Sequence, residues 1–128
     1  MKADSIKIIH YLLKRGSEPN LADNEGNTPM HLATERDMLN VVQLMIGTRG
    51  GDPEQQNMQG YSCLHIAARL GFLNIAKCLR TYSVEIEHLR DNEQFTASHW
   101  ANHNGHAEVA AVLPEPKEKT KEEYYAYI

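Results

Sequence analysis

Histidine is the side chain with the widest chemical range in this 128-residue sequence, which contains seven of them. The densest group is His99, His103 and His106. His99 and His103 lie four residues apart, a spacing that places two rings on the same face of a helix, and imidazole nitrogens there commonly bind Zn²⁺. A zinc site and a structural role are therefore the two interpretations of this group.

Other reactive residue types occur without the spacing that catalysis or phosphate binding needs. The glycine-rich run 47–51 lacks the Gly-Lys-Ser/Thr ending and the preceding strand of a phosphate-binding loop. No nucleophile has a base at a recognised motif spacing, and the acidic residues and histidines are scattered along the chain. We therefore expect no enzymatic activity, no catalytic residue and no cofactor.

Composition narrows the class of partner and the compartment. A formal net charge of −4 without a basic patch disfavours nucleic acid. Polar residues interrupt every apolar run within a few positions, so we expect no membrane span. Cys63 and Cys78 lack metal-type spacing, which predicts reduced thiols and a cytoplasmic location.

A period of 34 residues runs through the sequence, and each period predicts a turn followed by two helices. Gly26 favours the turn, Thr28-Pro29 favours a helix start, and the apolar residues of 41–46 favour a second, buried helix. This pattern predicts an all-α chain of helix-turn-helix repeats. The columns that recur are His31/His65/His99, Asp23/Asn57/Asp91, Thr28/Ser62/Thr96 and Ala33/Ala67/Ala101.

The sequence resembles the ankyrin repeat family over residues 5–113. Residues 23–33 are similar to that family's turn and Thr-Pro-Leu-His helix start, and residues 8–20 to its second helix and following loop. The resemblance implies an all-α ankyrin-repeat solenoid in which three helix-turn-helix repeats follow a half repeat. The expected domain is 1–113, with the half repeat at 5–22, repeats at 23–56, 57–90 and 91–113, and a charged tail with an aromatic end at 114–128.

The resemblance also assigns structural roles to several residues. His31, His65 and His99 occupy the position at which the family's histidine hydrogen-bonds local backbone, so we expect no bound metal. Asp37 and Gln94 stand at glycine-like positions, which predicts backbone strain there. The third repeat carries serine in place of the core leucine, and we interpret this repeat as a polar C-terminal cap.

Partner-binding residues follow by exclusion, because columns with constant chemistry are needed by the fold. The variable positions lie on the turn tips, such as Asn27, and on the first helices, such as Ile66, and in ankyrin proteins these line the concave face. Aromatic residues and arginine dominate binding hot spots. Packing of Trp100 on the neighbouring repeat is the alternative for that residue. The predicted partner-binding residues are Arg36, Tyr61, Arg69, Leu70, Phe95, Trp100 and His103.

Two functions are consistent with this pattern. The first is a protein-protein interaction module or scaffold that binds through its concave face. The second is a structural or accessory subunit of a larger assembly, held through an exposed first helix and the C-terminal tail. The family resemblance further implies that Asn20, at the matching distance from Leu12, is a possible site of asparagine hydroxylation.

Overall fold

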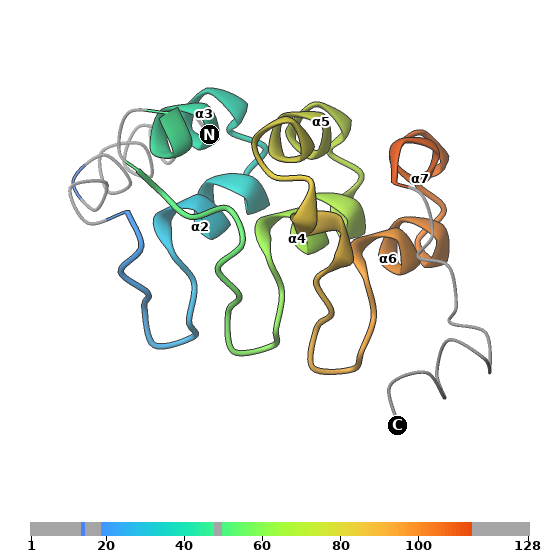
Figure 1. The fold of residues 1–128 in the computed structure, drawn as a ribbon, viewed down its shortest axis with the longest axis horizontal. Coiled ribbons are helices and arrows are strands. Elements are labelled where there is room, and N and C mark those ends of the chain that lie inside the picture. Colours follow the sequence, from blue (N-terminus) through green and yellow to red (C-terminus); the bar gives the residue numbers. More distant parts are fainter. Residues whose placement is uncertain (1–13, 15–18, 48–49, 114–128) are drawn as a thin grey trace, which may run out of the picture.

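Paired helices build the chain, and the computed structural model describes residue 14 and residues 19–47 and 50–113 (Figure 1). One row of helices contains α2, α4 and α6, and the second row contains α3, α5 and α7, with the turns projecting beyond the first row. No strand occurs in these ranges, so the predicted all-α solenoid is confirmed. The elements are α2 (Pro29–Glu35), α3 (Leu39–Gly47), α4 (Cys63–Leu70), α5 (Leu73–Tyr82), the 3₁₀ helix η1 (Glu85–His88), α6 (Ala97–His103) and α7 (Ala107–Val112).

Reciprocal caps start the first helices of the two earlier repeats. The Thr28 hydroxyl accepts from the backbone N–H of His31, and the His31 ring accepts from the backbone N–H of Thr28. Ser62 and His65 form the same pair at the start of α4. Each pair satisfies backbone donors that a helix N-terminus leaves free. Helix capping thus explains the Thr/Ser and His positions of these two repeats.

The core lies between the two rows of helices. Helix α4 packs against both α2 and α6, and α5 packs against both α3 and α7. Leu64, Ile75 and Leu79 are fully buried there. Alanines allow the first helices to approach closely, and all three residues of the recurring column are buried: Ala33, Ala67 and Ala101.

Left-handed backbone occurs at the two non-glycine residues that the sequence placed at glycine-like positions. Asp37 has a φ of 56° and Gln94 a φ of 70°, so that prediction is confirmed. Gly60 has a φ of 82°, and a Cβ there would lie 2.6 Å from the backbone nitrogen of Asn92 in the next turn. Successive turns therefore touch at a point where only glycine fits.

Several expectations concern parts of the chain outside the described residues. These are most of the half repeat at 5–22, including Leu12, and the tail at 114–128. The alternative role as a subunit held through the first helix and the tail depends on those segments. Among the described residues, no helix is long and apolar enough to cross a membrane.

Candidate protein-binding surface

Six side chains from α4, α6 and the turns before them gather on the row of first helices. Tyr61 precedes α4 and Arg69 lies near its end. Phe95 precedes α6, which carries the other three. Ring and cation contacts connect all six, which we call the aromatic–arginine cluster: Tyr61, Arg69, Phe95, His99, Trp100 and His103.

Trp100 is the centre of this cluster. Its ring meets Tyr61 edge-on at 6.1 Å and Phe95 edge-on at 5.8 Å between centroids. The indole Nε1–H donates to Oδ2 of the buried Asp91 at 2.7 Å. The other oxygen of Asp91 accepts the backbone N–H groups of Glu93 and Phe95. Because one buried carboxylate holds both the turn and the indole, the orientation of Trp100 is fixed.

Arg69 lies against two of these rings. Its Cζ is 4.8 Å from the centroid of Tyr61 and 5.2 Å from that of Trp100, within the range of a cation–π contact. The backbone carbonyl of Arg69 accepts from Asn104 Nδ2 and His106 Nε2, both at 2.9 Å. The third repeat thus holds Arg69 at its backbone and at its side chain.

The capping histidines of the first two repeats also connect each repeat to the next. His31 Nε2 donates to the carbonyl of Tyr61, and His65 Nε2 to the carbonyl of Phe95, each at 2.9 Å. Since Nδ1 accepts and Nε2 donates, each ring is neutral. The structural role expected for these two residues is confirmed.

His99 departs from the same prediction. Thr96, the N-cap of α6, makes no side-chain cap hydrogen bond. The His99 ring stacks on Phe95 with 3.7 Å between centroids and an angle of 6°, and it lies parallel to His103 at 5.8 Å. The expected backbone hydrogen bond of His99 is therefore wrong. His31 and His65 each bond to a carbonyl of the turn that follows their repeat. No described turn beyond α7 supplies such a carbonyl to Nε2 of His99.

Burial of the two capping histidines makes stability depend on pH. Desolvation lowers the pKa of His31 and of His65 below 6.5, although the carbonyl bonds partly oppose this. The unfolded chain therefore binds more protons, and stability is lost as pH falls from about 6.5 towards the lower folded pKa. We expect urea titrations to show the free energy of unfolding falling between pH 7.5 and pH 5, by at most about 1.4 kcal/mol per pH unit for each histidine.

The His65→Ala variant is the control for this pH dependence. It removes one of the two buried rings, so its free energy of unfolding is expected to fall less steeply with acidification. Equal slopes for the two proteins, or no change in stability over the range, would contradict this account.

The other predicted binding residues do not join the cluster. Arg36 is the exposed C-cap of α2 and makes no cation–π contact with a described ring. Leu70, 44% exposed, ends α4 beside Arg69 and is not among the residues that these ring and cation contacts connect. Two further expectations are wrong, because Asn27 and Ile66 are only 6% and 2% exposed. Asn27 accepts a bond from Asn57 of the next turn, and Ile66 is buried in α4.

Asn20 connects its loop to the next one. Its side chain accepts the backbone N–H of Asp52 at 2.7 Å and donates to the carbonyl of Gly50, and its own carbonyl accepts from Gln55. The amide thus has a structural use in the folded chain. Its hydroxylation stays a prediction.

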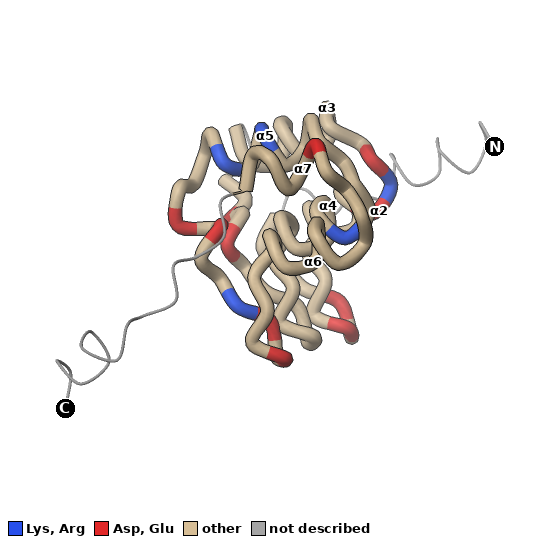
Figure 2. The backbone as a smooth tube through the Cα atoms, turned by 90° about the vertical axis from the view of Figure 1, so that its right-hand side faces the viewer, with Lys and Arg blue, Asp and Glu red and all other residues tan. Residues whose placement is uncertain are grey.

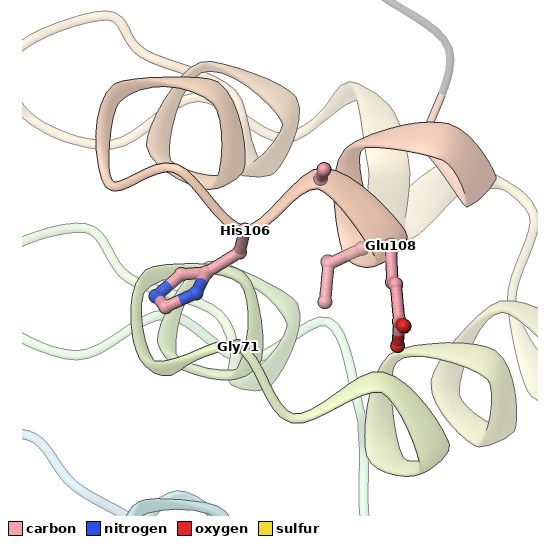
Figure 3. Close-up of a pocket in the computed structure, with 5 residues that line it drawn as sticks. Gly71, His106 and Glu108 are labelled. Carbon is pink, nitrogen blue, oxygen red and sulfur yellow. The ribbon is translucent and has the colours of Figure 1, made fainter.

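A small hollow of about 160 Å³ lies between the end of α4 and the start of α7 (Figure 3). His106 stands over Gly71, where a Cβ would lie 2.6 Å from Nδ1 of the ring. His106 is thereby directed at α4 and away from the His99 and His103 pair. Over the ranges that the structure covers, no three His, Cys, Asp or Glu side chains are placed to hold a metal ion.

The comparisons with known proteins agree with this architecture. A family model described as "Ankyrin repeats (3 copies)" matches residues 1–87 and 34–123. The chain is 49% identical over 39 residues to the potassium channel AKT1 of Arabidopsis thaliana, which is 30% of this chain and 5% of the channel. It is 38% identical over 40 residues to the putative ankyrin repeat protein FPV219 of fowlpox virus, strain NVSL. This match covers 31% of the chain and 9% of the viral protein. It is also 38% identical over 47 residues to the ANK repeat-containing protein nipk-1 of Caenorhabditis elegans. This match covers 35% of the chain and 8% of the nematode protein. The matched segments span less than a tenth of each of these relatives.

Proposed function

Because the chain belongs to the ankyrin repeat family, whose repeats generally serve as protein-protein interaction modules, we propose that it binds a protein partner through its concave face. In this proposal the face consists of α2, α4, α6 and the turns before them, and the chain acts as an interaction module or scaffold. Membership in a large complex and a role without catalysis, cofactor or nucleic acid belong to the same proposal.

The aromatic–arginine cluster is the observation that carries the proposal. Trp100, Tyr61 and Arg69 are of the three residue types that contribute most to binding energy at protein interfaces. The bond from Trp100 to Asp91 and the two bonds to the Arg69 carbonyl fix their positions. A partner therefore meets side chains that lose little freedom on binding, which favours affinity.

Both cysteines are free thiols, and this supports a cytoplasmic location within the proposal. Burial raises the pKa of the Cys63 thiol to about 12, so it remains protonated at neutral pH. Cys63 thus has a packing role.

Alanine substitutions test the binding face. Tyr61→Ala, Arg69→Ala and Trp100→Ala should each weaken partner binding by roughly 1–2 kcal/mol or more at a true hot spot. Affinity purification from the source organism with mass spectrometry would identify the partner, and calorimetric titration of the purified pair would measure the affinity.

The matched control for these variants is Tyr82→Ala. Tyr82 is 53% exposed and ends α5, in the other row of helices. Its removal should leave the affinity unchanged. If all three cluster variants remain folded by circular dichroism and bind the partner as tightly as the parent chain, the concave-face proposal fails.

A further inference from the structure

We propose that the aromatic–arginine cluster selects its partner through a carboxylate: an Asp or Glu side chain of the partner binds the guanidinium of Arg69, beside apolar atoms that pack on Trp100. This inference rests on the proposed function, since it names the chemistry of the segment that the same surface receives. Two features of the described residues support it, and a third sets the direction of the effect that one charge substitution should have.

The first feature is that Arg69 has no anionic partner within the described ranges. Its Nε is buried without a hydrogen-bond acceptor, and its two Nη groups are neither buried nor bonded to a described residue. Two other described arginines, Arg80 and Arg90, differ from Arg69 in this respect. Arg80 pairs with Glu87 and donates to the carbonyl of Val112, and Arg90 donates to the carbonyl of Gln94. Arg69 therefore retains donors that suit an incoming carboxylate.

The second feature is that these donors are held in place. A guanidinium that lies against ring faces keeps its N–H groups available at its edge, in the plane that carboxylates recognise. Tyr61 and Trp100 provide the rings, and Asn104 and His106 hold the backbone of Arg69. The aromatic neighbours also exclude water from part of the site, which strengthens a charged hydrogen bond.

The third feature is the distribution of charge. Figure 2 shows acidic positions at the tips of the projecting turns, where the sequence has Glu25 and Glu93. Glu35, the last residue of α2, is close enough to Arg69 for their charges to interact. Desolvation raises the pKa of Glu35 although its side chain is exposed, and the charges of Arg36 and Arg69 partly oppose the rise. Glu35 is thus the described carboxylate that interacts with Arg69 at a distance, and it would compete with a partner's carboxylate.

The position of Glu35 predicts whether its replacement strengthens or weakens the binding of a charged partner. Replacing Glu35 by Gln removes an opposing negative charge, so an acidic partner should bind more tightly. A cationic partner that displaced Arg69 from the rings would instead bind more weakly to Glu35→Gln. The two kinds of partner are therefore distinguished by one variant.

The experiment uses the full chain and three pools of short blocked peptides, identical except for a fixed central Glu, Gln or Lys flanked by apolar residues. Trp100 is the single tryptophan, so its indole N–H gives one assigned NMR signal. We expect the Glu pool to shift this signal and the Gln and Lys pools to leave it in place. The best Glu peptide should bind Arg69→Gln at least about tenfold more weakly, which corresponds to one charged hydrogen bond.

Lys77→Gln is the matched control, because it makes the same change of charge at an exposed residue of α5, in the other row of helices. It should alter the affinity of the Glu peptide less than Arg69→Gln does. Preference for the Lys pool, equal affinity for the Glu and Gln peptides, or no shift from any pool at millimolar concentration would overturn the carboxylate inference.

The partner titrations separate this inference from the function on which it rests. If the native partner is lost with Tyr61→Ala and Trp100→Ala but is retained by Arg69→Gln at low and high salt, the binding face stands and carboxylate selection fails. If all of these variants bind the partner normally, the proposed function itself fails.

Discussion

Replacement of His65 by alanine is expected to lower the free energy of unfolding by about 2–4 kcal/mol. The change removes the reciprocal cap with Ser62 and the bond to the carbonyl of Phe95. It also leaves space around a ring that is fully buried. The same replacement at His99, the third residue of the column, should cost about 1 kcal/mol or less, because its ring caps nothing and stacks only on exposed or half-buried neighbours.

Urea denaturation of the parent chain and the two alanine variants at pH 7.5 would measure this difference. The pair is matched because both residues occupy the N3 position of a first helix. Equal losses of stability at the two sites would show that the capping bonds contribute little.

The second large effect is expected at Gly60. An alanine there must adopt a φ near +82° and would place its Cβ 2.6 Å from the Asn92 nitrogen and 2.9 Å from the carbonyl carbon of Asp91. Because both contacts are with backbone, neighbouring turns must separate to relieve them. We expect a loss of about 2–4 kcal/mol in the free energy of unfolding, the sum of backbone strain and steric overlap.

Gly105→Ala provides the matched control for Gly60→Ala. Its φ of +75° is similar, but no atom lies within 4 Å of the added Cβ. Only the backbone strain remains, which costs about 1–2 kcal/mol. Thermal and urea unfolding of the two variants should therefore differ, and identical destabilisation would rule out contact between the turns as the reason for glycine at position 60.

Local chemistry made much of the fold predictable from the sequence. Helix starts at Thr28 and Ser62, the left-handed backbone of Asp37 and Gln94, and the apolar faces of the second helices each depend on residues a few positions apart. Such patterns repeat in register, so one unit supports the interpretation of the next.

Contacts between repeats were harder to predict from the sequence than these local patterns. Variation along two columns suggested that Asn27 and Ile66 were free to contact a partner. The neighbouring repeat covers Asn27, however, and Ile66 is in the packed interior. The bond from Trp100 to Asp91 was also missed, because it joins a helix to the turn before it with no recurring motif. The same limit applies to His99, whose recurring identity hides a different environment.

The junction between repeats leaves the proposed binding surface free to change during evolution. His31 and His65 bind the backbone carbonyls of Tyr61 and Phe95, and every amino acid possesses that carbonyl. The side chains at those two positions, which belong to the aromatic–arginine cluster, can therefore be exchanged without removing the bond that joins one repeat to the next. Selection for a new partner can act on positions 61 and 95 while selection for a stable stack acts on 31 and 65.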